Sequence, residues 1–89
     1  MCAYDEEKNI AKAISNIPKT IQGIDQIEIL VIDDGSTDKT IEIAKKHNVA
    51  RIISHKTNLG IGAAFMTGIR NAISMNADVV VSIDADGEA

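Results

Sequence analysis

A pair of aspartates separated by one alanine, Asp84 and Asp86, follows an apolar run near the end of the sequence. In an extended segment, side chains at positions i and i+2 point to the same side, so the carboxylates of this pair can face one point. Carboxylates held together repel each other, and a divalent cation that prefers oxygen ligands relieves this repulsion. The pair is therefore compatible with Mg²⁺ or Mn²⁺ carrying a diphosphate, although a pair that stands alone is more often a solvated acidic turn after a strand.

A second acidic pair, Asp33 and Asp34, ends an earlier apolar run. Alternation along a strand sends the two side chains to opposite sides, so only one of them can face a ligand cleft. A carboxylate at a strand end can accept hydrogen bonds from a ribose or a base, and the other is expected to cap nearby backbone N–H groups. Gly35 and Ser36 are typical of a turn and a helix N-cap.

The segment "NLGIGAA", residues 58–64, contains Gly60 and Gly62 before a helical pattern. It lacks the lysine of a Walker motif and the full spacing of a dinucleotide-binding loop, so close packing of a helix on a sheet is favoured over phosphate binding. His47 and His55 have no histidine or cysteine partner at metal-ligand spacing and are interpreted as surface imidazoles.

Apolar periodicity predicts the elements that position these residues. Helices are expected over 7–17, 37–47 and 62–75. The first is ended by Pro18, and the last has Ile61, Phe65, Ile69, Ala72 and Ile73 on one face. Strands are expected over 27–32, 50–54 and 78–83. This alternation predicts a parallel sheet with right-handed crossovers, whose ligand site lies beyond the carboxyl ends of the strands.

Composition limits the class of protein. The 89 residues suit one small domain, and the 45% apolar and 25% charged fractions are those of a globular protein. The net charge of −4 argues against a nucleic-acid partner. The single cysteine excludes an internal disulfide, and no run is apolar enough to span a membrane, so a cytoplasmic location is predicted.

The motifs "AYDEEKNI", "VIDDGSTDKT", "NLGIGAAFMTGIRNA" and "DADGE", in this order, resemble the amino-terminal half of a family 2 glycosyltransferase with the GT-A fold. Within that family the chain is most similar to dolichyl-phosphate mannose synthases and related polyprenyl-phosphate sugar transferases. The resemblance implies an α/β fold, the Rossmann-like three-layer parallel sheet of nucleotide-diphospho-sugar transferases. Residues 1–89 would form a truncated nucleotide-sugar-binding domain whose first strand is missing.

The same resemblance implies a UDP- or GDP-sugar donor bound with Mg²⁺ or Mn²⁺. In matching positions, Tyr4 and Glu6 would contact the nucleoside, Ile32 would line its pocket and Asp34 would hold the base. The remaining roles fall near the end of the sequence: Asp84 near the ribose, Ala85 at the sugar, Asp86 as the metal ligand, and Glu88, often glutamine in the family, as a further ligand. No catalytic residue is assigned.

The chain also departs from the family pattern. Cys2 stands for a proline and Asp5 for an asparagine, and without a first strand the segments 27–32 and 78–83 would pair directly or expose edges that favour self-association. The acceptor site of the family lies after the aspartate pair, so the chain alone is not expected to transfer a sugar. The alternative is a non-catalytic module that only binds or self-associates. A phosphatase or phosphotransferase fits less well, because its aspartate pair follows the first strand.

Overall fold

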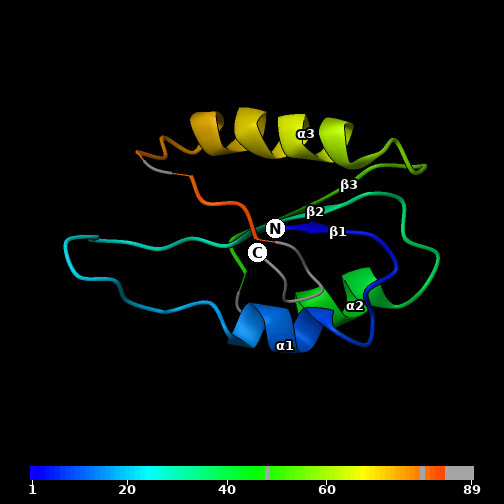
Figure 1. The fold of residues 1–89 in the computed structure, drawn as a ribbon, viewed down its shortest axis with the longest axis horizontal. Coiled ribbons are helices and arrows are strands. Elements are labelled where there is room, and N and C mark those ends of the chain that lie inside the picture. The colour runs from blue at the N-terminus through cyan, green and yellow to red at the C-terminus, as the bar shows by residue number, and fades with distance from the viewer. Residues whose placement is uncertain (48, 79, 84–89) are drawn as a thin grey trace.

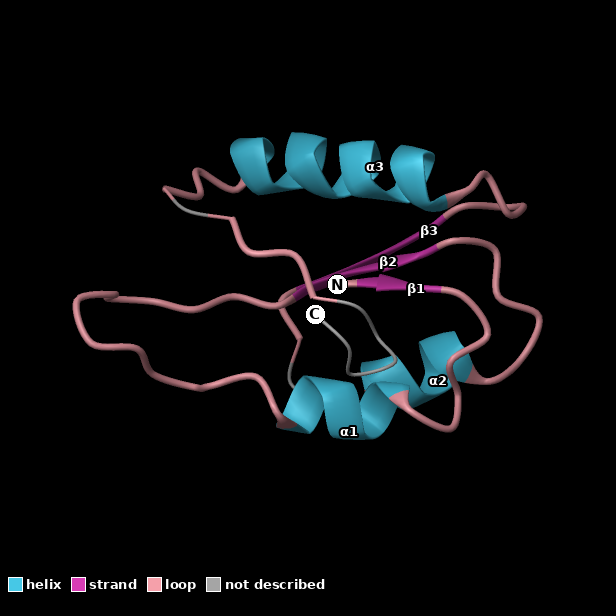
Figure 2. Cartoon of the chain, viewed as in Figure 1, coloured by secondary structure: helices cyan, strands magenta, loops and turns pink. Residues whose placement is uncertain are grey.

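The computed structural model describes residues 1–47, 49–78 and 80–83. Strands and helices alternate along the chain in the order β1 (Cys2–Ala3), α1 (Ile10–Ser15), β2 (Leu30–Asp33), α2 (Thr40–Lys45), β3 (Arg51–Ser54) and α3 (Ile61–Ser74). The strands form a parallel sheet with β2 between β1 and β3. Helix α3 covers one face and α1 and α2 cover the other (Figures 1 and 2). This three-layer arrangement confirms the predicted fold class.

The strand register aligns the carboxyl ends of all three strands. Asp33, the last residue of β2, pairs with Ala3 of β1 on one side and with Ser54 of β3 on the other. The loops that follow the strands therefore leave the sheet at one edge, called here the carboxyl edge. Ligand sites of parallel α/β sheets form at such an edge.

The core lies between the sheet and the two short helices. Helix α1 buries Ile10, Ala13 and Ile14, whose spacing places them on one helical face. Ile10 and Ile14 belong to one apolar cluster with Val31 of β2. Burial of such aliphatic side chains contributes about 1.5–3 kcal/mol each.

Helix α3 packs on the opposite face through small residues. Ala64 and Ala72 are buried, and a Cβ atom added at Gly68 would lie 3.6 Å from Cγ1 of Ile32. Of the apolar residues predicted to share one helical face, Ile61 and Ile73 are not buried against the sheet, because their side chains are 75% and 68% exposed. Small residues four positions apart let the helix approach the strand closely, which turns the larger side chains outward.

The predicted elements are present with different ends. Helices α1 and α2 are shorter than the expected 7–17 and 37–47, and β2 lies a few residues after the start of the expected 27–32. Ser36 is not the N-cap of α2, because Lys39 occupies that position and the Ser36 hydroxyl bonds elsewhere. Contacts between loops therefore outweigh the local helical pattern at these ends.

The expectation that the first strand is missing is wrong, because β1 pairs with β2 through Cys2 and Ala3. Strand β2 consequently has a neighbour on each side and exposes no edge. The strand expected over 78–83 is also wrong for its described residues, and Val80 and Val81 are 48% and 72% exposed instead of buried. Self-association through strand edges stays a prediction.

None of the helices in the described part of the chain combines the length and apolar character that crossing a bilayer requires.

Candidate functional site

The loops that follow β1 and β2 bind each other at the carboxyl edge. The N–H of Asp5 donates to the Ser36 hydroxyl at 2.9 Å, and the N–H of Thr37 donates to the Asp5 carboxylate at 2.7 Å. Asp5 adopts a left-handed backbone conformation with φ of +50°, which aspartate and asparagine tolerate better than most residues. Asp5 therefore anchors this junction although it replaces the asparagine of the family pattern.

The same two loops are joined again one turn further along. The N–H of Glu6 donates to the buried Thr40 hydroxyl at 2.9 Å, and the N–H of Glu7 donates to Asp38 at 3.2 Å. Asp38 also accepts from the N–H of Thr40 at 2.9 Å and from its hydroxyl. Burial alone would raise the pKa of Asp38, but these hydrogen bonds lower it below the ordinary aspartate value.

Asp33 serves its own loop. It is 1% exposed, and its carboxylate accepts from the N–H of Ser36 at 3.0 Å and from the Ser36 hydroxyl. The prediction that one member of the aspartate pair caps local backbone N–H groups is confirmed.

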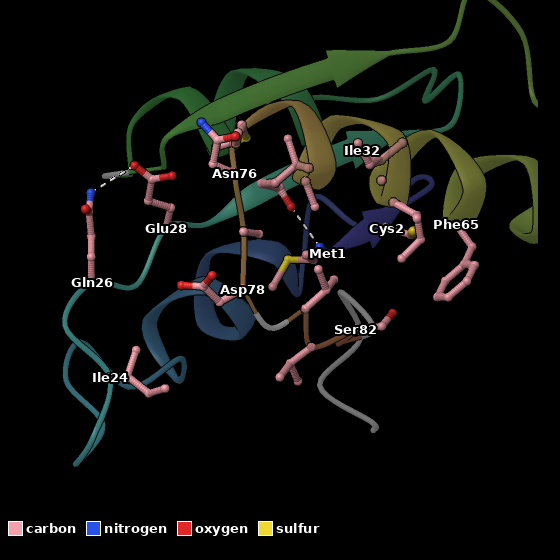
Figure 3. Close-up of a pocket in the computed structure, with 18 of the residues that line it drawn as sticks. Met1, Cys2, Ile24, Gln26, Glu28, Ile32, Phe65, Asn76, Asp78 and Ser82 are labelled. Atoms are coloured by element: carbon pink, nitrogen blue, oxygen red, sulfur yellow. Dashed lines mark hydrogen bonds between the residues drawn. The ribbon is translucent and has the colours of Figure 1, made fainter.

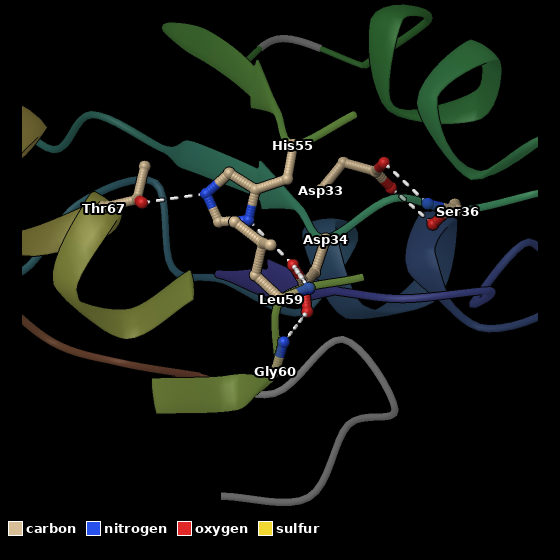
Figure 4. A network of polar contacts seen from close by, with 7 residues as sticks. All are labelled: Asp33, Asp34, Ser36, His55, Leu59, Gly60 and Thr67. Atoms are coloured by element: carbon tan, nitrogen blue, oxygen red, sulfur yellow. Dashed lines mark hydrogen bonds and ion pairs between the residues drawn. The ribbon is translucent and has the colours of Figure 1, made fainter. Parts of the chain in front are cut away.

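Asp34 points to the other side and binds the loop between β3 and α3 (Figure 4). Its Oδ1 atom lies 2.7 Å from Nδ1 of His55 and accepts from the N–H of Leu59 at 2.9 Å. Its Oδ2 atom accepts from the N–H of Gly60 at 2.8 Å. Burial alone would raise the pKa of Asp34, but the hydrogen bonds from His55, Leu59 and Gly60, with the charge interaction with His55, lower it below the ordinary value.

The glycines of the β3–α3 loop have a different role from the one expected. The N–H groups of Leu59 and Gly60 do hold an anion before α3, but this anion is the Asp34 carboxylate. The prediction that Gly60 and Gly62 allow close packing of the helix on the sheet is wrong, since a Cβ atom at either position would have no atom within 4 Å. The close approach occurs at Gly35, where φ is +78° and a Cβ atom would lie 2.5 Å from the carbonyl carbon of Thr57.

His55 was not expected to belong to a site, and its interpretation as a surface imidazole is wrong. Its side chain is 11% exposed, and its Nε2 atom lies 2.9 Å from the hydroxyl of Thr67 on α3. Asp34 and His55 are the first residues after two adjacent strands, which end at the paired residues Asp33 and Ser54. Polar residues directly after successive strands are the sequence feature that could have identified this pair.

The structure separates the residues predicted to bind the nucleoside. Tyr4 is 45% exposed on the loop after β1, where the carboxylate of Glu6 accepts from the Asn9 amide at 3.0 Å. Ile32 lines a cavity of about 590 Å³ that it shares with Cys2 and Phe65 (Figure 3). Tyr4, Glu6 and Asp34 are not among the described residues that line this cavity. The polar cluster and the cavity are thus distinct features.

The remaining predicted residues, Asp84, Ala85, Asp86 and Glu88, lie outside the described residues. Within residues 1–47, 49–78 and 80–83, no three His, Cys, Asp or Glu side chains are grouped so that they could hold a metal ion. The carboxylates of Asp33 and Asp34 already accept hydrogen bonds from protein donors. The described carboxylates therefore do not fit a cation site.

The sequence model of the protein family described as "Glycosyl transferase family 2" matches residues 1–89 of this chain. The chain belongs to glycosyl transferase family 2. An uncharacterised protein of Methanocaldococcus jannaschii is 42% identical over 86 residues, which cover 97% of this chain and 33% of that protein. The UDP-N-acetylglucosamine–dolichyl-phosphate N-acetylglucosaminyltransferase of Methanococcus voltae is 33% identical over 97% of this chain and 39% of its own length.

A third family 2 relative is the dolichol-phosphate mannosyltransferase of Pyrococcus furiosus. It is 33% identical over 93% of this chain and 23% of its own length. The chain thus spans between about a quarter and two fifths of these relatives.

Proposed function

We propose that this family 2 chain forms the nucleotide-sugar-binding part of an enzyme that transfers a sugar from a UDP- or GDP-sugar to an acceptor such as a polyprenyl phosphate or a glycan. The observation that carries the proposal is the family match over residues 1–89. Relatives named for transfer of sugars to dolichyl phosphate support the lipid-phosphate acceptor. The single cysteine favours a reducing compartment, so we also propose a cytoplasmic location.

The carboxyl edge supports donor binding. Tyr4, Glu6 and Asp34 all follow strands that end at this edge, which is where ligands of parallel α/β sheets bind. In the proposal, Tyr4 and Glu6 contact the nucleoside and Asp34 accepts from the base. Ile32, two residues before Asp34 and on the same side of the sheet, would line the nucleoside pocket from the cavity. The hydrogen bonds between the two loops hold this surface in place before a ligand arrives.

The segment after residue 83 completes the proposed donor site. Asp84 would lie near the ribose and Ala85 at the sugar, while Asp86 and Glu88 would hold Mg²⁺ or Mn²⁺. Carboxylates at alternate positions are the hard oxygen donors that such ions prefer, and a bound ion neutralises charge on the departing diphosphate. A phosphate acceptor is already an anion at neutral pH, so it needs no strong general base.

Thermal unfolding with nucleotides tests the proposal. UDP or GDP with Mn²⁺ is expected to raise the unfolding temperature, because a ligand at 100 times its Kd stabilises a folded protein by about 2.7 kcal/mol. Asp86→Ala should remove the effect of Mn²⁺, whereas the matched control Asp25→Ala, in an exposed loop, should retain it. The absence of a shift with every nucleotide would contradict the proposal.

A further inference from the structure

The carboxylate of Asp34 has one acceptor position left. A carboxylate offers about four lone-pair positions, two on each oxygen. Among the residues that the structure describes, Oδ1 interacts with both His55 Nδ1 and the N–H of Leu59, whereas Oδ2 accepts only from the N–H of Gly60. Because an ionised carboxylate can only accept, Nδ1 of His55 must carry its proton towards Oδ1. Oδ1 is therefore filled, and Oδ2 can take one more donor.

The His55 ring is held in the orientation that fills Oδ1. Its other nitrogen lies 2.9 Å from the hydroxyl of Thr67, on the second turn of α3. A threonine hydroxyl can donate or accept, so this contact is compatible with both the neutral and the charged imidazole. Thr67 and Asp34 thus fix the two ring nitrogens from opposite sides (Figure 4).

A single open acceptor discriminates between nucleobases. Guanine presents two adjacent donors, the ring N1–H and an amino group, and a carboxylate pairs with both only if each oxygen has a free position. Cytosine and adenine present an amino group with two hydrogens, one of which would lack a partner. Uracil presents one ring N–H between two carbonyl groups, and this single donor matches a single acceptor. A buried donor left unpaired lowers affinity substantially.

We propose that His55 restricts Asp34 to one open acceptor position and thereby makes the nucleoside site select uracil over guanine. The inference rests on the proposed function, in which Asp34 accepts from the base. His55 acts as a positioning residue, since it fills Oδ1 without contacting the ligand itself. The UDP-linked name of the Methanococcus voltae relative agrees with this preference.

The ratio of the Kd values for UDP and GDP, measured by calorimetry with Mn²⁺, tests the inference. We expect the wild-type chain to bind UDP at least about tenfold more tightly than GDP, the effect of one unpaired donor. His55→Ala frees a position on Oδ1 and should bring the ratio close to one. His55→Asn, whose amide nitrogen can lie near the Nδ1 position, should restore most of the preference. The matched control His47→Ala, two residues after α2 and outside the network, should behave as wild type.

A purely structural role for His55 would weaken binding of both nucleotides equally, so the ratio separates the two explanations. Circular dichroism shows whether His55→Ala folds. If it does not, Thr67→Val can replace it: this variant removes only the contact of the Thr67 hydroxyl with Nε2 of His55, and it should also reduce the preference for UDP over GDP. A wild-type preference for GDP, CDP or ADP, or a ratio unchanged in the folded variant, would overturn this inference but leave the proposed function intact. Binding of no nucleotide at all would overturn the proposed function as well.

Discussion

Asp34 and His55 leave adjacent parallel strands side by side, and Oδ1 of Asp34 lies 2.7 Å from Nδ1 of His55. Through His55 and Thr67 this contact extends from β2 to α3, so that one chain of hydrogen bonds joins the sheet to the helix above it. Both carboxylate oxygens of Asp34 accept from protein donors, and hydrogen bonds of this kind between buried groups make an arrangement more rigid. The position of the first turn of α3 therefore depends on the charge of Asp34.

Acid should destabilise the fold through Asp34. Its pKa is lower in the folded chain than the ordinary value of about 3.9. The charged carboxylate therefore stabilises the fold fully above the ordinary value, and this stabilisation is lost as the pH falls from there through the lower pKa of the folded state. Asp34→Asn should destabilise the chain at neutral pH, and the difference from wild type in urea unfolding should shrink as the pH falls below the ordinary aspartate value.

The exposed Asp25 provides the control for this experiment. Asp25→Asn should leave the acid dependence as it is in the wild type. If Asp34→Asn and wild type lose stability in parallel as the pH falls, the low pKa of Asp34 is not the cause of the acid effect.

Gly35 should tolerate no side chain. A Cβ atom there would lie 2.5 Å from the carbonyl carbon of Thr57 and 2.6 Å from the backbone nitrogen of Asn58. Backbone atoms cannot move aside as a flexible side chain can, and φ of +78° adds strain for alanine. We expect Gly35→Ala to lower the free energy of unfolding by about 2–4 kcal/mol.

Gly23 separates the steric effect from the conformational one. Its φ of +85° is similar, but no atom lies within 4 Å of its Cβ position. Gly23→Ala should therefore cost only about 1–2 kcal/mol, the cost of a left-handed conformation. Equal losses in the two variants, measured by urea unfolding, would show that the contact between Gly35 and the 57–58 backbone is not important.

The Thr40 hydroxyl should contribute more than its methyl group. Thr40 is fully buried, accepts from the N–H of Glu6 and donates to Asp38. Thr40→Val keeps the shape but leaves the N–H of Glu6 without its acceptor and Asp38 with one donor fewer, so we expect a loss of about 1–3 kcal/mol in unfolding free energy. Thr40→Ser keeps the hydroxyl and removes one methyl group, which should cost about 1 kcal/mol. A smaller loss for valine than for serine would refute the role of the hydroxyl.

The elements that the sequence predicted well are those with a complete apolar pattern of their own. The long helix α3 and the strands β2 and β3 lie within a few residues of their expected ranges. The predictions for β1 and for the described residues of 78–83 were wrong, because whether a short segment forms a strand depends on its neighbours more than on its own residues. The residues that α3 buries could not be read from its apolar pattern for a similar reason, since the small Ala64 and Ala72 lie against the sheet and the larger Ile61 and Ile73 do not.

The polar cluster was only half predictable. The acidic pair at the end of β2 was recognised because carboxylates after a strand are conspicuous, and the division of labour between Asp33 and Asp34 follows from alternation. His55 was missed because its partner lies 21 positions earlier, and only the register between β2 and β3 brings the two together. Such a register is a tertiary property that local spacing does not contain.

The carboxyl edge also sets an order of events for a chain emerging from the ribosome. Its loop-to-loop hydrogen bonds join residues 31 to 34 positions apart, and Asp34 finds its partners 21 to 26 positions later. Contacts over such separations form late, because the entropy of loop closure must be lost before they contribute. Asp34 thus stays without the donor at Gly60 until that residue has been synthesised, so the contacts of the carboxyl edge cannot be complete before then.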